Sequence, residues 1–163
     1  MLRWVVMRHA RAPQAMDSRR DHERPLDQRG QREAAVIGAM LASRGWWPDR
    51  VLSSDAVRTR ETWAAAAPAG PPAEASYLSA FYESGAVAAL EAAQSLPPSV
   101  TTLLTLGHNP EWERLVGLLT REFVVLGTAH TALLSCAKAR WDDAVVPGLW
   151  QLEEILQPTD PSD

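Results

Sequence analysis

The chain has 163 residues, of which 46% are hydrophobic and 22% charged, and these values are typical of one globular domain with an ordinary core. Its net charge of −4, without a basic run or interleaved aromatic residues, argues against nucleic-acid binding. No apolar stretch is long enough to cross a membrane, no signal peptide is recognisable, and the lone Cys136 excludes an internal disulfide, so we expect a cytoplasmic protein.

Strand and helix patterns alternate along the chain, and the strand patterns are short runs rich in apolar and β-branched residues. In chain order the predicted elements are a strand at 1–7, a loop at 12–26, a helix at 27–45, a strand at 49–53, a helix from 54 or 55 to about 66, a helix at 86–95, a strand at 101–106, a helix at 110–120, a strand at 132–137, a short helical piece at 141–145 and a strand at 150–155. The helix starts are marked by residues that favour them, which are Asp27, Ser54 or Asp55, and Pro110.

This alternation favours a single three-layer α/β/α domain with a mainly parallel central sheet. We place the domain at residues 1–157 and expect a loose tail at 158–163. No linker or internal repeat divides the chain. The stretch from Arg58 to His108 spans only fifty positions and holds one modest predicted helix, so we expect no large lid insertion.

Polar residues follow three of the predicted strands at the point where each strand ends. Arg8 and His9 follow the first strand, and His108 follows the strand at 101–106. Ser53 and Ser54 come at the end of the second strand and directly after it, and Arg58 lies in the first turn of the helix that follows. Because the carboxyl ends of parallel strands meet at one edge of a sheet, we expect these side chains to share a pocket.

Such a pocket joins two guanidiniums and two imidazoles without a carboxylate, and these groups repel one another unless an anion lies between them. A phosphoryl group fits, because its oxygens accept many charge-assisted hydrogen bonds. The helix N-terminus at Arg58 also favours an anion. The arginines hold the nearby histidines in the neutral form, which is the nucleophilic form of imidazole.

The charge distribution agrees with an anion site in the first part of the chain. Residues 1–60 carry 12 of the 15 arginines and 7 carboxylates, a net charge of +5, whereas residues 61–163 carry −9. Codon usage in a GC-rich genome accounts for much of this arginine bias, but the planar fork of arginine also suits phosphate. We therefore predict a positive pocket in an acidic protein.

The segment Val6-Met7-Arg8-His9-Ala10-Arg11-Ala12 resembles the Arg-His signature of the histidine phosphatase superfamily, in the Arg-His-Ala form of its short SixA-type branch. Further segments agree with that branch in order and spacing, and they are Asp21-His22-Glu23-Arg24-Pro25-Leu26 with Gly30, Ser53-Ser54-Asp55-Ala56-Val57-Arg58 through Thr62, Leu106-Gly107-His108-Asn109-Pro110 and the closing strand after Trp141. The likeness spans nearly the whole chain and implies a phosphoglycerate mutase-like fold.

The resemblance also implies a mechanism. His9 would attack phosphorus to form a phosphohistidine intermediate that water then hydrolyses, while Arg8, Arg58 and His108 neutralise the phosphoryl oxygens. No metal or cofactor is implied, and the chain has no His-x-x-x-His or His-x-His spacing for zinc.

Two residues depart from the pattern of the branch. Asp55 stands where that branch usually has proline, and Asp27 where it usually has serine or threonine. Both can cap a helix, so we expect the fold to tolerate them. Asp55 also places a carboxylate near Arg58, and a pair between the two would compete with phosphate and reduce activity.

Several other side chains are candidates for supporting roles. The candidates for substrate binding are Arg11, Arg24 and Asn109, and those for a general acid are Glu83, Asp21 and Asp17. We interpret His22 and His130 as solvated or structurally satisfied. Arg19 and Arg20 form a solvated pair that could help to recruit an acidic partner.

A short chain without a lid suits a phosphorylated protein side chain better than a small metabolite that must be enclosed. A P–N bond also needs less help from a general acid than a P–O ester, because the departing imidazole is protonated on its ring. We therefore expect a monomeric phosphohistidine phosphatase that acts on a partner such as a histidine-containing phosphotransfer domain. The alternatives are a phosphomonoesterase for a nucleotide or sugar phosphate and an adaptor that binds phosphoryl groups without turnover.

Overall fold

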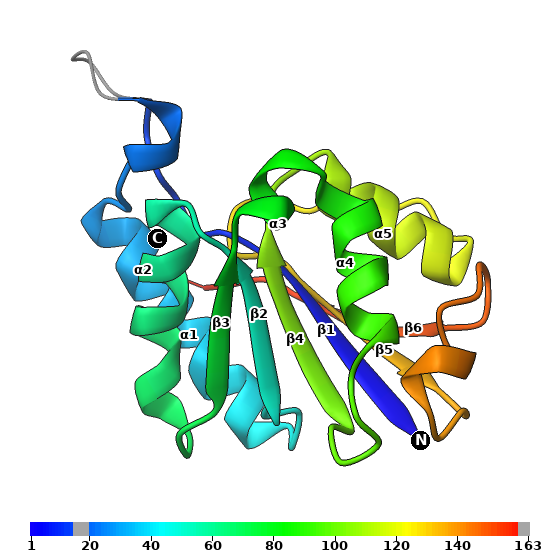
Figure 1. Ribbon diagram of the computed structural model, residues 1–163. Helices are drawn as coiled ribbons and strands as arrows, with labels where there is room; N and C mark the ends of the chain where they lie inside the picture. The colour runs from blue at the N-terminus through cyan, green and yellow to red at the C-terminus, as the bar shows by residue number, and fades with distance from the viewer. Residues whose placement is uncertain (15–19, 160–163) are drawn as a thin grey trace.

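The computed structural model describes residues 1–14 and 20–159, and its centre is one mixed sheet (Figure 1). Within these residues the strands are β1 (Leu2–Arg8), β2 (Arg50–Ser54), β3 (Glu74–Leu78), β4 (Thr102–Gly107), β5 (Thr131–Cys136) and β6 (Gln151–Leu156). They lie in the order β3-β2-β4-β1-β5-β6. The first four in this order run parallel, and β5 and β6 are antiparallel to their neighbours. The prediction of a mainly parallel sheet is therefore confirmed.

The register of the parallel strands brings three predicted loops to one edge of the sheet. Arg8 at the end of β1 pairs with Gly107 at the end of β4, and Ser53 of β2 pairs with Leu106. The residues that follow these strands consequently start from neighbouring points on the upper edge in Figure 1.

Helices cover both faces of the sheet, which gives the predicted three layers (Figure 1). One face packs on α1 (Gln28–Ser43) and α2 (Val57–Ala66), and the other on α4 (Gly85–Gln94) and α5 (Glu111–Thr120). The short α3 (Ser79–Glu83) connects β3 to α4, and the 3-10 turns are η1 (Asp21–Glu23), η2 (Ala67–Ala69) and η3 (Trp141–Asp143). Hydrophobic side chains form a separate core cluster on each side of the sheet.

Two parts of the secondary structure differ from the sequence prediction. The strand β3 and the helix α3 were not expected, because β3 is a half-buried edge strand without an apolar run and α3 has only five residues. The second helix begins after Ala56, whose side chain cannot cap it, so the expectation of a cap at Ser54 or Asp55 is wrong. The cap at Asp27 is confirmed, since its side chain accepts the N–H of Gly30 at 2.8 Å.

Residues 158–159 have no regular structure, and residues 160–163 of the expected tail lie outside the described residues. Asp17 and Arg19 also lie outside them. Among the described residues, no helix is both long enough and apolar enough to cross a membrane.

Candidate active site

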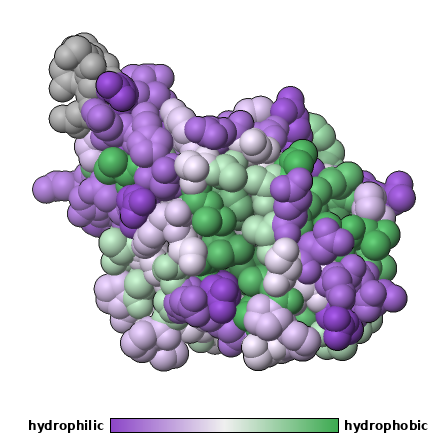
Figure 2. All heavy atoms as spheres, in the orientation of Figure 1, coloured by the Kyte–Doolittle hydropathy of each residue, from purple (hydrophilic) through white to green (hydrophobic). Residues whose placement is uncertain are grey.

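The structure brings the two histidines of the predicted pocket together at the upper edge of the sheet. The ring centres of His9 and His108 are 5.3 Å apart, and His9 is only 7% exposed. Arg8 ends β1, and Arg58, which is 5% exposed, is the second residue of α2. The N-terminal ends of α1 and α2 and the turn η1 form a largely hydrophilic surface at the upper left of Figure 2.

His9 is held in the neutral form with one ring nitrogen free. Its Nδ1–H donates to the carbonyl oxygen of Ala10 at 2.8 Å, and this assignment leaves a lone pair on Nε2. Burial lowers the pKa of His9 to about 4. The positive charges of Arg58 and Arg8 also lower this pKa, whereas the hydrogen bond to Ala10 raises it. A neutral imidazole with an unprotonated Nε2 is a competent nucleophile at neutral pH.

The backbone around His9 is bonded on both sides. The N–H of His9 donates to Gly107 at 3.0 Å, and its carbonyl accepts from Ala129 at 2.9 Å. The next N–H, that of Ala10, donates to the hydroxyl of Thr62 at 3.0 Å, which ties the loop to α2. The nucleophile candidate therefore has a fixed main chain.

His108 is also neutral, and Ser54 decides which of its nitrogens carries the proton. The Ser54 hydroxyl accepts the N–H of Ala56 at 3.2 Å and is free to donate to His108 Nε2, 2.8 Å away. The proton of the imidazole then lies on Nδ1, which is buried without a partner. Burial, Arg58 and His9 together lower the pKa of His108 to about 3.

The packing of Trp112 against Gly107 explains why a glycine precedes His108. A Cβ atom at that position would lie about 2.5 Å from the indole of Trp112, which is closer than packing allows. Because Gly107 has no side chain, the end of β4 lies directly on α5, and this packing fixes the point at which His108 leaves the sheet.

Each of the two arginines has a buried Nε donor without a partner. Arg8 Nη1 donates to the carbonyl of Leu126 at 3.0 Å, and the amide of Asn109 donates to the same oxygen at 2.8 Å. Arg58 Nη1 donates to the carbonyl of Asp21 at 2.8 Å. The Nε atoms of both arginines are buried without a partner, as is the side-chain oxygen of Asn109. Buried donors without acceptors are rare in proteins, and here two of them belong to the predicted phosphoryl pocket.

One carboxylate does belong to this pocket, contrary to the expectation that none would. Asp21 Oδ2 accepts from Arg58 Nη2 at 3.1 Å and from the Tyr82 hydroxyl at 2.8 Å, while Arg24 Nε donates to Oδ1 at 3.0 Å. Burial raises the pKa of Asp21, but the hydrogen bonds from Tyr82 and Arg24 and the charge of Arg58 outweigh it and bring the pKa to about 2. An ionised Asp21 has no proton to donate at neutral pH, so it fits the role of an anchor for Arg58 better than that of a general acid.

The pair between Asp55 and Arg58 that the sequence made possible is not formed. Asp55 Oδ1 lies 2.8 Å from His22 Nε2 instead, and Arg58 pairs with Asp21. The reason is that η1 crosses in front of α2 and presents both Asp21 and His22 to it. His22 is thus neither isolated nor simply solvated.

The remaining candidates lie at varying distances from the pocket. Arg24 reaches it through Asp21, and it also donates to the carbonyl of Ala12. Arg11 pairs with Asp27 at 3.0 Å and is half exposed. Glu83 is exposed on α3 and contacts none of the four central residues. The role of Tyr82 was missed, because its segment carries no recognisable motif and only the fold shows that α3 covers His108.

Two further findings bear on other kinds of site. Within the described residues, no three His, Cys, Asp or Glu side chains gather as metal ligands would.

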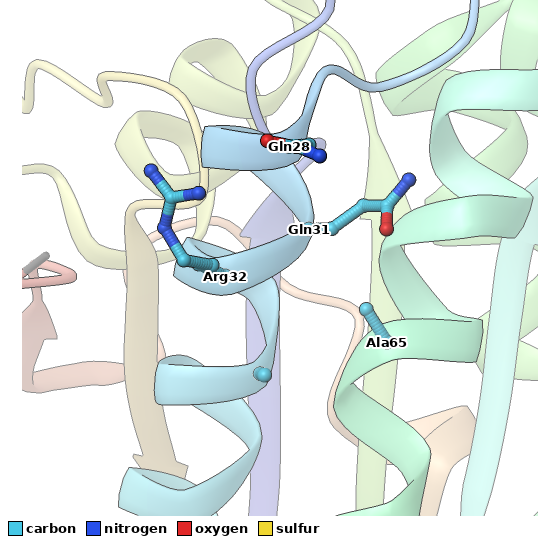
Figure 3. A pocket seen from close by; sticks show the side chains of 5 residues that line it. Gln28, Gln31, Arg32 and Ala65 are labelled. Carbon is cyan, nitrogen blue, oxygen red and sulfur yellow. The ribbon is translucent and has the colours of Figure 1, made fainter.

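A cavity of about 490 Å³ lies between α1 and α2, lined by Gln28, Gln31, Arg32, Ala35 and Ala65 (Figure 3). None of these side chains is a nucleophile or a proton donor near neutral pH, so the chemistry of the molecule belongs to the strand ends.

Comparison with known proteins identifies relatives over most of the chain. The model of the histidine phosphatase superfamily (branch 1) matches residues 4–96. An uncharacterized chloroplastic protein of Arabidopsis thaliana is 34% identical over 169 residues, which cover 96% of this chain and 78% of that protein. An uncharacterized protein of Mycobacterium tuberculosis is 37% identical over 113 residues, covering 69% of each.

Solved structures of SixA proteins share the fold. The Nakamurella multipartitia protein, provisionally named phosphohistidine phosphatase SixA, superposes with a TM-score of 0.84 at 30% identity and covers 98% of this chain and 97% of its own. Its counterpart from Agrobacterium tumefaciens gives a TM-score of 0.79 at 29% identity, covering 96% and 98%. The family match, the relatives and the shared fold lead to one conclusion: this chain belongs to the histidine phosphatase superfamily and has the SixA-type form of its fold.

Proposed function

We propose that this protein hydrolyses phosphohistidine on other proteins through a phosphohistidine intermediate on its own His9. The observation that carries the proposal is a set of unpaired buried donors, Nε of Arg8, Nε of Arg58 and Nδ1 of His108, next to a histidine with a free Nε2. Leaving such donors without acceptors costs free energy. A phosphoryl group brings three acceptor oxygens and would satisfy all of them at once.

In the first step, Nε2 of His9 attacks phosphorus in line with the bond that breaks. The bond from Nε2 to phosphorus forms as the P–N bond of the substrate breaks. The leaving imidazole, already protonated on its other ring nitrogen, departs as the neutral base with the electron pair of that bond. The carbonyl of Ala10, which accepts the Nδ1–H of His9, stabilises the positive charge of the phosphorylated ring. Arg8, Arg58 and His108 neutralise the equatorial oxygens.

In the second step, a water oxygen attacks the same phosphorus atom and the electron pair of the P–N bond returns to His9. Inorganic phosphate leaves with the protons of the water. The low pKa of His9 favours this step, because the imidazole is a better leaving group when its free form is stable as the neutral base.

The choice of a protein substrate rests on the shape of the chain around the pocket. The elements between Arg58 and His108 are α2, η2, β3, α3, α4 and β4, and all of them belong to the three layers of the domain. No separate segment among them is available to enclose a small metabolite. SixA names in related structures point in the same direction, with phosphohistidine phosphatase as their provisional assignment.

The proposal is tested by comparing substrates. The purified protein is incubated with a histidine phosphotransfer domain that has been phosphorylated with phosphoramidate, and separately with glucose 6-phosphate and a nucleoside monophosphate. We expect a higher kcat/KM for the phosphoprotein. Preference for either ester would instead identify a small-molecule phosphomonoesterase, and binding of vanadate without hydrolysis of any substrate would identify an adaptor.

The intermediate is tested with His9→Ala, which should abolish turnover and the acid-labile phosphoenzyme that forms during it. His130→Ala serves as a matched control, because it also removes an imidazole but leaves the four pocket side chains in place. Full activity in His9→Ala would remove this residue as the nucleophile.

A further inference from the structure

His22 and Asp55 form a hydrogen-bonded pair at the mouth of the candidate active site. His22 Nε2 lies 2.8 Å from Asp55 Oδ1, and their side chains are 38% and 26% exposed. His22 comes from η1 and Asp55 from the turn between β2 and α2, so the fold joins residues 33 positions apart.

Each residue of this pair is next in the sequence to a residue whose side chain is hydrogen-bonded to a pocket side chain. Asp21, next to His22, bonds to Arg58, and Ser54, next to Asp55, bonds to His108. The pair is thereby anchored to the pocket through two separate backbone segments.

Tyr82 connects the pair to the pocket through its ring. The ring stands perpendicular to that of His22, with centres 4.9 Å apart, and meets the ring of His108 at 81° and 5.4 Å. His108 in turn lies 5.3 Å from His9. The exposed fraction rises along this row, from 7% at His9 to 36% at Tyr82, so His9 marks the floor of the pocket and His22 lies at its mouth.

The direction of the reaction places the leaving group at the same mouth. In-line displacement requires the leaving atom to be opposite to the attacking Nε2 of His9. Because His9 is on the floor, the leaving atom points outwards, toward the side on which His22 lies.

We propose that His22 is the proton donor to the leaving group and that Asp55 orients it. With Nε2 bonded to Asp55, the proton that is transferred is that on Nδ1, for which the described residues offer no partner. A carboxylate bonded to one imidazole nitrogen fixes the orientation of the ring, as in other Asp–His pairs. This inference rests on the proposed phosphatase function.

His22 loses a proton in the first step and regains one in the second. In the first, the bond from His9 Nε2 to phosphorus forms, the bond from phosphorus to the leaving oxygen or nitrogen breaks, and the leaving atom takes the Nδ1 proton of His22. Neutral His22 then accepts a proton from the attacking water as the phosphoenzyme is hydrolysed, which restores its starting state.

Other described groups near the mouth fit this role less well. Asp21 is ionised, Glu83 contacts none of the pocket residues, and the hydrogen bond to Asp21 raises the pKa of Tyr82 above its usual value. A donor at this place matters most for phosphomonoesters, whose alkoxide or phenoxide leaving groups need a proton more than imidazole does. The pair therefore predicts that the pocket also hydrolyses esters.

The titratable and charged groups that surround His22 come from four elements. They are Asp21, Glu23 and Arg24 on and beside η1, Asp55 and Arg58 at the start of α2, Tyr82 on α3 and His108 after β4. A general acid acts only in its protonated form, so ester hydrolysis by the wild type should fall toward high pH.

The test measures how activity depends on the leaving group. Wild type, His22→Gln and Asp55→Asn are assayed with phenyl phosphate, a poor leaving group, with 2,4-dinitrophenyl phosphate, a good one, and with phosphoramidate. Asp142→Asn, which removes a carboxylate from the exposed pair with Arg140, is the matched control. Circular dichroism and thermal unfolding verify that each variant is folded.

We expect His22→Gln to lower kcat for phenyl phosphate by about 100-fold and for 2,4-dinitrophenyl phosphate by less than about tenfold, because a good leaving group does not need the proton. Asp55→Asn should give a smaller loss with the same preference. The fall of kcat for phenyl phosphate at high pH should disappear in His22→Gln.

Equal losses for both esters, or no loss, would overturn the role of His22, and so would a pH profile that keeps its basic limb in His22→Gln. Such a result leaves the proposed function standing as long as the wild type hydrolyses phosphoramidate and phosphoprotein. A wild type that hydrolyses no substrate at all would refute the phosphatase itself.

Discussion

Acidification should destabilise this protein through the two histidines of the pocket, and replacing either of them with asparagine should remove half of the effect. The reasoning starts from the environments of His9 and His108, which burial and neighbouring positive charge keep neutral. Their pKa values are about 4 and about 3, against an ordinary value of 6.5. An unfolded chain therefore takes up two protons in a pH range where the folded chain takes up neither.

The magnitude follows from proton linkage. Because the folded pKa of each histidine is lowered, the stability associated with its neutral form is fully present above pH 6.5 and is lost as pH falls toward about 4 for His9 and about 3 for His108. One unit of pKa difference corresponds to about 1.4 kcal/mol. Between pH 7 and pH 5 each histidine should lower the free energy of unfolding by about 2 kcal/mol, and both together by about 4 kcal/mol.

Urea denaturation at pH 7 and pH 5 measures this loss, with the slope of the transition compared to verify two-state unfolding. Between pH 7 and pH 5 the free energy of unfolding of the wild type should fall by about 4 kcal/mol more than that of a variant carrying both His9→Asn and His108→Asn. The fall for each single variant should lie midway. Equal losses in the wild type and in the double variant would show that the two imidazoles titrate normally. The neutral nucleophile on which the proposed mechanism depends would then have to be abandoned.

Three further predictions concern the supports of the pocket. Arg58→Lys should weaken inhibition by orthovanadate about 10- to 100-fold, since lysine cannot supply the Nε–H donor, and an unchanged Ki would mean that this donor does not face the anion. Ser54→Ala should shift the proton of His108 between its nitrogens, which 15N NMR detects, and lower kcat about tenfold without lowering the melting temperature in proportion. Gly107→Ala should destabilise the protein by about 1–3 kcal/mol through contact of the new methyl group with Trp112, and a melting temperature equal to that of the wild type would contradict the close packing at this position.

Most of the fold could be predicted because its central strands are apolar on both faces. The strands expected at 1–7 and 101–106 correspond to β1 and β4, which are buried along almost their whole length. By contrast β3 lies at the edge of the sheet and is only partly buried, so its sequence carries no strong hydrophobic pattern. The same lack of burial hid α3 and, with it, the position of Tyr82 over the pocket.

The convergence of Arg8, His9, Arg58 and His108 could be anticipated because it depends only on strand direction and on residues next to strand ends. The side chains that pair with these residues could not be anticipated in this way. The sequence suggested Asp55 as a possible partner of Arg58 and Asp21 as a possible general acid, but the packing of η1 against α2 makes Asp21 the carboxylate that pairs with the arginine. Sequence spacing places a side chain on an element, whereas the choice between two nearby carboxylates depends on distances of a few ångströms.

The main-chain bonds on either side of His9 have a consequence for how this protein loses activity. With β4 on one side and the start of β5 on the other, the peptide groups of His9 have no local opening that would free them while the sheet persists. Their amide hydrogens should therefore exchange with solvent only through global unfolding. Heat inactivation should then coincide with the melting of the whole domain, and His9, the proposed nucleophile, should be among the last parts of the chain to become disordered.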